Sequence, residues 1–374
     1  MMGTARPLAT TASITSRRLH SQGLTGEPFT APTDAVRWLC AVQAQDYSAA
    51  KWAVGQRTDG ATEIELDRLF DDGALLRTHV MRPTWHFVLP EDIGWMLELT
   101  GPRVRLAMRA RDRQLEIDDR VADRACEAFV GALDGGHHLT RQELGEVLRT
   151  AGISPEGQRL PHLLMTAELH GLITSGPRHG KQFTYALLEE RAPAARQRDR
   201  SDAIAELARR YFESHGPAQV QDFVWWSGLT VRDARMGIAI SGSALEREVV
   251  ADKEYWFGLT VRPGSAAQPE AHLLPNFDEY TVAYRDRAAV LEIDDASDPG
   301  LDPFGGILSN VVVVTGRVRG AWRRTVRRGI VQVELRLRAQ LSPSEAAAVE
   351  DAALRLGQFL GLPVAVSWPD ASRK

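Results

Sequence analysis

The sequence predicts an α+β protein in which helix-rich segments precede a strand-rich C-terminal third. Apolar residues recur at three- and four-residue spacing through about the first 260 residues, as amphipathic helices require. Short alternating segments interrupt these helices, and alternation is typical of strands. The chain has 374 residues, 44% of them hydrophobic, which is enough for roughly two to four domains.

Composition argues against several classes of protein. Only two cysteines occur, Cys40 and Cys126, so neither a disulfide framework nor a cysteine-based zinc site is expected. No apolar run approaches the roughly 20 residues that span a bilayer, and the N-terminus lacks the apolar core of a secretory signal. We therefore expect a cytoplasmic protein with no membrane partner. The net charge of −4 means that any nucleic-acid-binding surface must be local.

The N-terminal part predicts several helices followed by a hairpin. Residues 1–12 are expected to be a loose lead-in. Apolar spacing predicts helices at 16–22, 32–42, 48–56 and 63–70, and alternation predicts strands at 75–81 and 84–89.

The clearest local pattern lies in the middle of the chain. Thr140 and Glu143 form a Thr-x-x-Glu capping box, which marks the start of a helix. A second helix is expected at 155–170, followed by strands at 172–174 and 182–187 with a basic turn between them. Helix, turn, helix and basic-tipped hairpin is the order of a winged helix. The neighbouring His137 and His138 diverge and have no third ligand nearby, so no metal site is expected there.

This pattern recurs along the chain. A helix is expected at 203–214, a second helix begins at 217, and residues 229–233 cap a third, short helix. Strands are expected at 245–250 and 255–259. The sequence thus predicts three tandem winged-helix units, at 13–120, 121–195 and 196–264.

Residues 265–374 predict a small β-barrel-like domain or, alternatively, a sheet domain. Strands are expected at 273–284, 307–318, 331–339 and 364–366, and a terminal helix at 342–360.

Gln43 and Gln45 form the most informative short motif. Residues two apart on an extended chain point the same way, so both amides could face one cavity. An amide offers a donor and an acceptor but does not ionise near neutral pH, so it can hold a water but cannot act as a carboxylate base. The alternative is a pair of solvated or capping side chains. The adjacent Asp46 is expected to cap a helix or turn.

Arginines gather in two places. One group follows residue 103, and the other includes Arg323-Arg324 and Arg327-Arg328, which flank a predicted hairpin turn. The planar guanidinium suits bidentate contact with phosphate, so the second group is a candidate DNA contact. Ordinary solvated faces are the alternative.

Four blocks, taken in order, resemble one family. They are Gln43-Ala44-Gln45, the segment 76–86 (LRTHVMRPTWH), the segment 273–280 (LLPNFDEY) and the segment 320–324 (GAWRR). The chain resembles the winged-helix DNA glycosylases of the AlkZ and YcaQ type over nearly its whole length. The resemblance implies three winged helices and a β-barrel around a DNA-binding channel. It also implies a catalytic motif of glutamine-x-glutamine or glutamine-x-aspartate, and this chain carries the first form at Gln43 and Gln45. That form resembles the subgroup that removes bulky cationic lesions and confers self-resistance in antibiotic producers.

The chemistry of such lesions suits two amides. A purine alkylated at N7 or N3 is cationic, so its base leaves without protonation, and the sugar passes through an oxocarbenium-like state. We expect Gln43 and Gln45 to orient the attacking water, with no metal or organic cofactor. Without a carboxylate at Gln45, activity on neutral lesions should be poor. Unhooking of interstrand crosslinks and a role in resistance remain open.

Other residues are candidates for the same site. His79, His86 and Asp278 could line the active site. The more common role for such histidines is structural, and Asp278 could equally belong to a buried structural network. The expected partner is double-stranded DNA with alkylation damage, bound by a monomer. The expected DNA-binding residues are Arg77, Arg82, Arg178, Lys181, Arg323, Arg324, Arg327 and Arg328.

A second class of function is also compatible with the pattern. A non-catalytic winged-helix DNA-binding protein, such as a transcriptional regulator, would need exposed basic recognition helices and would place no demand on the glutamines.

Overall fold

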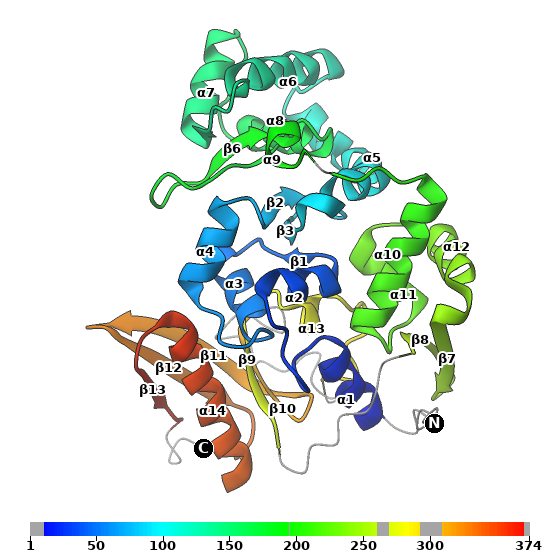
Figure 1. The fold of residues 1–374 in the computed structure, drawn as a ribbon, viewed down its shortest axis with the longest axis vertical. Helices are drawn as coiled ribbons and strands as arrows, with labels where there is room; N and C mark the ends of the chain where they lie inside the picture. Colours follow the sequence, from blue (N-terminus) through cyan, green and yellow to red (C-terminus); the bar gives the residue numbers. More distant parts are fainter. Residues whose placement is uncertain (1–10, 194, 260–268, 292–308, 370–374) are drawn as a thin grey trace.

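The computed structural model describes residues 11–193, 195–259, 269–291 and 309–369. Most of the expected loose N-terminus, and the first two residues of the strand expected at 307–318, lie outside these ranges. Along the longest axis, a small helical unit occupies one end and a strand-rich unit the other, with a three-stranded sheet between them (Figure 1).

The N-terminal part forms helices around a small antiparallel sheet of order β1-β3-β2. Its elements are α1 (Thr11–Ser21), α2 (Pro32–Leu39), β1 (Val42–Gln43), α3 (Tyr47–Gly55), α4 (Glu63–Asp71), β2 (Leu76–His79), β3 (Trp85–Val88) and α5 (Pro90–Gln114). The four expected helices and the hairpin are present, but the helix expected at 32–42 ends at Leu39, and Val42 belongs to β1, a strand that was not expected. Thr11 and the following residue of the expected loose N-terminus are already part of α1. Asp46 accepts the Ala49 N–H at 3.0 Å, which confirms its capping role.

The middle part follows the expected order of elements. They are α6 (Asp119–Leu133), β4 (Leu139–Thr140), α7 (Arg141–Thr150), α8 (Arg159–Leu169), β5 (Ile173–Ser175), β6 (Thr184–Leu187) and α9 (Leu188–Arg191). The sheet order is β4-β6-β5. The capping box of Thr140 and Glu143 is confirmed at the start of α7. This part has its own core, which includes Phe129, Leu144 and Leu163.

The next part packs against the central sheet. Its elements are α10 (Arg200–His215), α11 (Val220–Ser227), α12 (Val231–Ser241), a short 3-10 turn (Gly242–Ala244), β7 (Leu245–Val250) and β8 (Lys253–Gly258). Leu76 of β2 and Val88 of β3 share a buried cluster with Tyr211 and Trp226, so one face of the central sheet is covered by α10 and α11. Figure 1 places α10 to α12 together beside that sheet.

The C-terminal part is an open sheet, so the barrel expected there is wrong and the alternative of a sheet domain is correct. Its elements are β9 (Ala271–Leu274), α13 (Glu279–Val282), β10 (Val311–Val314), β11 (Arg317–Arg327), β12 (Ile330–Leu337), α14 (Pro343–Leu360) and β13 (Val364–Ser367). The strand order is β13-β12-β11-β10-β9. Among the described residues the two edge strands, β13 and β9, do not pair with each other, because residues of α14 such as Leu356 complete the core instead.

Two expected strands also end earlier than the alternation indicated. The strand expected at 273–284 stops at Leu274, and Asp278 then caps the short helix α13 by accepting the Tyr280 N–H. The strand expected at 307–318 breaks at Thr315 and Gly316, whose φ angles are 49° and 77°. Two consecutive positive φ angles are those of a tight hairpin turn, which joins β10 to β11.

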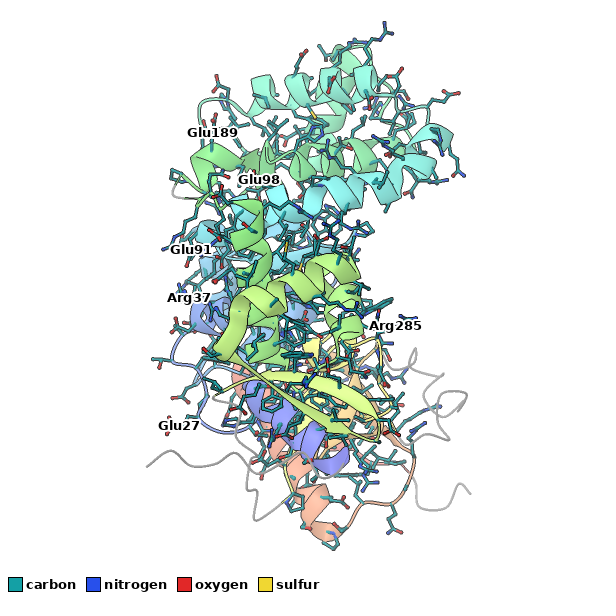
Figure 2. All side chains as sticks on the ribbon, turned by 90° about the vertical axis from the view of Figure 1, so that its right-hand side faces the viewer. Glu27, Arg37, Glu91, Glu98, Glu189 and Arg285 are labelled. Carbon is teal, nitrogen blue, oxygen red and sulfur yellow. The ribbon has the colours of Figure 1, made fainter. Side chains whose placement is uncertain are left out.

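Ion pairs also join neighbouring helices at the surface. Arg37 of α2 contacts Glu91 of α5 at 3.2 Å, and both side chains are labelled in Figure 2 on the same side of the molecule. Across the described ranges, each helix is either too short or too polar to traverse a lipid bilayer.

Candidate active site

Gln43 is held on a buried strand by contacts on two sides. It pairs with His86 across β1 and β3, and the residue is only 6% exposed. Its Oε1 accepts a hydrogen bond of 3.0 Å from Arg82 Nη2. Its backbone N–H donates to Glu279 Oε1 at 2.8 Å. The amide of Gln43 is therefore fixed in one orientation by a cation.

A polar row crosses the central sheet at Gln43. Register aligns Gln43 with His86 and His86 with Thr78, and directly opposed residues of antiparallel strands share one face. Burial, and then the charge of Arg82, lowers the pKa of His86 to about 3, so the ring is neutral. Its Nδ1 lies 2.9 Å from the Thr84 carbonyl and donates to it, which leaves Nε2 as an acceptor.

Several polar atoms near this row are buried without a hydrogen-bond partner among the described residues. They are Thr78 Oγ1, Arg82 Nη1, Thr84 Oγ1 and His86 Nε2. Buried polar atoms usually find partners, so each of these atoms is available to hydrogen-bond with a small polar molecule such as water.

Gln45 lies just beyond the strand and is exposed. β1 ends at Gln43 and the chain bends at Gln45, so the two glutamines are not on one continuous strand. The Oε1 of Gln45 accepts a long hydrogen bond, 3.4 Å, from the Trp85 N–H. The two side chains thus both lie against β3, one buried and one open to solvent. A cavity shared by both remains a prediction.

Arg77 binds the backbone of the Gln43–Gln45 motif. Its Nε donates to the Ala44 carbonyl at 2.9 Å and its Nη2 to the Gln45 carbonyl at 3.3 Å. The guanidinium lies 4.3 Å from the centre of the Trp85 ring and 5.0 Å from that of Phe183. Burial lowers its pKa. Arg77 therefore positions the loop around Gln45, while its backbone N–H donates to Ser175 of the middle part.

The remaining candidate lining residues have strong structural partners. His79 Nδ1 hydrogen-bonds with Glu168 of α8, and its ring lies 4.5 Å from that of Trp85. Asp278 is fully buried and accepts two hydrogen bonds of 2.8 Å from Arg57, besides capping α13. His79 therefore packs against Trp85, whose N–H contacts Gln45. The carboxylate of Asp278 is instead occupied by Arg57.

Glu279, the neighbour of Asp278, is a contact that sequence reasoning missed. It is fully buried, and its Oε1 accepts the Gln43 N–H while Oε2 accepts Trp226 Nε1 at 2.9 Å. Within the segment 273–280, the sequence pattern pointed to Asp278 as the candidate. The pattern contained no sign that Glu279, 236 positions from Gln43, reaches that residue.

Two of the expected DNA-binding cations belong to the hairpin of the middle part. Arg178 donates to Asp71 at 2.7 and 3.0 Å and pairs with Asp67 at 2.9 Å, so its fork is turned toward α4. Lys181 is exposed at the hairpin tip and lines a pocket of about 510 Å³ together with Arg77, Trp85 and Phe183. Two residues of this pocket contact Gln45, since Arg77 donates to its backbone carbonyl and the Trp85 N–H donates to its side chain.

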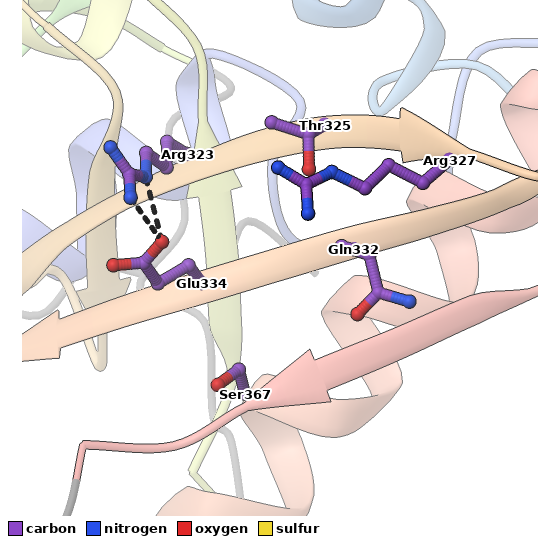
Figure 3. A pocket seen from close by; sticks show the side chains of 6 residues that line it. All are labelled: Arg323, Thr325, Arg327, Gln332, Glu334 and Ser367. Carbon is purple, nitrogen blue, oxygen red and sulfur yellow. Dashed lines mark hydrogen bonds and ion pairs between the residues drawn. The ribbon is translucent and has the colours of Figure 1, made fainter.

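The other four expected cations lie on β11 and its turn. Arg323 donates to Glu334 at 2.7 Å, and both line a pocket of about 370 Å³ with Arg327 (Figure 3). Arg324 donates to Ser48 Oγ at 2.7 Å, close to the start of α3. Arg327 and Arg328 are exposed where β11 turns into β12. Within the described ranges no cluster of three or more metal-binding side chains occurs.

Comparison with known proteins identifies the family. The family model described as DNA glycosylase AlkZ-like matches residues 36–359. The chain belongs to the AlkZ-like DNA glycosylase family. It is accordingly an enzyme and a DNA glycosylase, and the matched range contains Gln43, Gln45 and the open sheet except for its edge strand β13. The alternative of a non-catalytic regulator loses its support.

Relatives of the AlkZ-like family agree with this assignment. The chain is 28% identical over 315 residues to an interstrand DNA cross-link repair glycosylase of Streptomyces sahachiroi, covering 79% of this chain and 83% of that protein. The solved structure of the Streptomyces sahachiroi DNA glycosylase AlkZ superposes with a TM-score of 0.77 at 23% identity. That superposition covers 97% of this chain and all of the other, so the overall fold is shared.

Proposed function

We propose that this DNA glycosylase hydrolyses the N-glycosidic bond of cationic N7- or N3-alkylated purines in duplex DNA. We propose further that it releases the same linkage when it is part of an interstrand crosslink, the substrate named for the Streptomyces sahachiroi relative. The observation that carries the proposal is a pair of amides, Gln43 and Gln45, at a site where Gln43 is buried and bound by Arg82.

The substrate supplies most of the driving force. Breaking the bond between C1′ and the purine nitrogen sends the electron pair to the base, which neutralises its positive charge. The deoxyribose becomes oxocarbenium-like, a water adds at C1′, and one proton passes to solvent. Because the base departs in its neutral form without taking up a proton, no general acid is required, and a site without a carboxylate at position 45 suffices.

Gln43 and Gln45 would act by orienting the water. A carbonyl oxygen has two lone pairs, and each Oε1 uses one of them, toward Arg82 in Gln43 and toward the Trp85 N–H in Gln45. The second lone pair can accept a hydrogen bond from water. Holding a nucleophile in place can supply several kcal/mol of barrier reduction. His79 would act indirectly, by packing against Trp85, which would contact the lesion.

DNA binding would use three winged-helix units in one chain. The order helix, strand, helix, helix and hairpin from α6 to β6 supports this for the middle unit. We propose that the units and the open sheet border a DNA-binding channel and that a monomer in the cytoplasm wraps one duplex. Lys181, Arg327 and Arg328 are exposed and suited to phosphate contacts.

The proposal is tested by base release from defined duplexes. Purified protein is incubated with oligonucleotides that contain one N7-methylguanine, one nitrogen-mustard crosslink, or one neutral lesion such as uracil or hypoxanthine. We expect release from the first two and little from the neutral lesions. Release from the neutral lesions alone, or from none of the duplexes, would contradict the proposed substrate class.

A further inference from the structure

A fully buried carboxylate touches the proposed catalytic strand from a distant part of the sequence. Glu279 lies in the first turn of α13, and neither of its oxygens is exposed. Oε1 accepts the backbone N–H of Gln43 at 2.8 Å. Oε2 accepts Trp226 Nε1 at 2.9 Å and lies 3.4 Å from His215 Nε2. One carboxylate thus joins β1 to α10 and α11.

The environment keeps this carboxylate charged. Burial by itself would raise the pKa of Glu279, but the contact and charge of His215, the Gln43 N–H and the charge of Arg82 together hold that pKa below its usual value. The reciprocal effect is seen at Arg82, where burial lowers the pKa of the guanidinium and Glu279 opposes that change. Arg82 and Glu279 therefore act on Gln43 as a cation at its side chain and an anion at its backbone.

The anchoring of α13 is already provided by the neighbouring residue. Asp278 caps α13 and pairs with Arg57, so that segment is anchored without Glu279. A buried charge is costly unless several groups compensate it. The carboxylate of Glu279 contacts Gln43 on one side and α10 and α11 on the other. This arrangement is expected of a group that supports a catalytic residue.

We propose that Glu279 is a positioning residue for base excision, which fixes Gln43 through its backbone N–H and balances the charge of Arg82 beside the Gln43 amide. This inference rests on the proposed function. Glu279 itself does not touch the substrate. It affects the chemical step because the fixed backbone keeps the side-chain carbonyl of Gln43 in the orientation that can accept a hydrogen bond from the attacking water.

The variant Glu279→Gln tests the roles of the two carboxylate oxygens and of the negative charge. The two N–H donors bind different oxygens of Glu279, and the amide replaces one of these oxygens with an NH2 donor. The variant therefore loses either the bond from Gln43 or the bond from Trp226, and it carries no charge to balance Arg82. Single-turnover release of N7-methylguanine is measured with enzyme in saturating excess, alongside DNA affinity and thermal unfolding. We expect the single-turnover rate to fall by about 10- to 100-fold, with DNA affinity changed less than about twofold.

The matched control is Trp226→Phe. It removes the other N–H donor to Glu279 but leaves the contact with Gln43 in place. We expect a lower unfolding temperature with a rate within about twofold of the wild type. If Glu279→Gln does not unfold cooperatively, Glu279→Asp provides the second test, because it keeps the charge but is one methylene too short to reach Gln43.

A double variant decides whether Glu279 acts through Gln43. If it does, adding Glu279→Gln to Gln43→Ala lowers the rate by less than about twofold beyond Gln43→Ala alone. The inference is overturned if the two losses multiply, or if the wild type releases base while both Glu279 variants match its rate. No release by the wild type contradicts the proposed function itself, and the two failures are therefore distinguishable.

Discussion

The guanidinium of Arg82 donates a hydrogen bond of 3.0 Å to the side-chain carbonyl of Gln43. The two residues come from different elements, since Gln43 ends β1 and Arg82 lies in the turn between β2 and β3. A hydrogen bond from a cation polarises the amide and fixes which of its ends faces Arg82. The orientation of the proposed water-binding group is thus set by a residue of the block 76–86.

Arg82→Met should therefore slow base release. The variant keeps much of the apolar stem but removes the donor, leaving the Gln43 amide free to rotate. We expect the single-turnover rate to fall by about 10- to 100-fold, the range associated with a hydrogen bond to a charged group. Arg37→Met is the control, because Arg37 is an exposed partner of Asp34 and Glu91 at the surface. Equal rates for Arg82→Met and the wild type would contradict the role of Arg82.

Arg77→Lys should impair the enzyme although it keeps the positive charge. Lysine cannot reproduce the fork that joins the Ala44 and Gln45 carbonyls or the stacking of Arg77 on Trp85. We expect a rate reduction of about tenfold or more, with a smaller effect on DNA affinity. The measurement is single-turnover release over a range of enzyme concentrations. A change in affinity alone would show that Arg77 contacts DNA instead.

Arg327→Ala and Arg328→Ala should weaken DNA binding by removing cations that can bind phosphates. Removing one such cation reduces the slope of log affinity against log salt concentration by roughly 0.9. The measurement is fluorescence anisotropy with undamaged duplex over a series of salt concentrations. Arg247→Ala, which removes an exposed arginine paired with Glu254 on β8, is the control. Unchanged slopes for both hairpin variants would exclude the β11–β12 turn from the interface.

Stability should fall as pH decreases, because two histidines are buried in the neutral form. Burial lowers the pKa of His272 and of His86 to about 3, against about 6.5 in an unfolded chain. Between those values the unfolded chain binds more protons, so each histidine lowers the free energy of unfolding by about 1.4 kcal/mol per pH unit as pH falls.

His272 offers the cleaner test, since it lies outside the proposed site. We expect His272→Leu to reduce the pH slope of the urea-derived unfolding free energy below pH 6.5 by about that amount. An identical slope in the variant and the wild type would mean that His272 is not held neutral in the folded protein.

The sequence was most informative where the signal is local. The cap at Asp46, the capping box at Thr140 and the presence of the expected helices follow from neighbouring residues, and the structure confirms them, although several helix ends are displaced. A recognisable motif also marks Gln43 and Gln45 in the sequence, and their catalytic role stays a prediction.

Long-range partners were not foreseeable in the same way. Arg178 looks like a free cation in a basic turn, yet Asp67 and Asp71 of α4 bind it. Glu279 reaches Gln43 only because α13 and β1 meet in the fold. The open sheet replaced the expected barrel for a related reason, since strand alternation does not say which edges pair.

The decisive experiment for the mechanism compares Gln43→Ala and Gln45→Ala with the wild type in single-turnover release of N7-methylguanine from duplex DNA. If the two amides orient the water, the rate of each variant falls at least about tenfold while it still binds the duplex. Wild-type rates in both variants would contradict the mechanism and move the active site elsewhere on the protein.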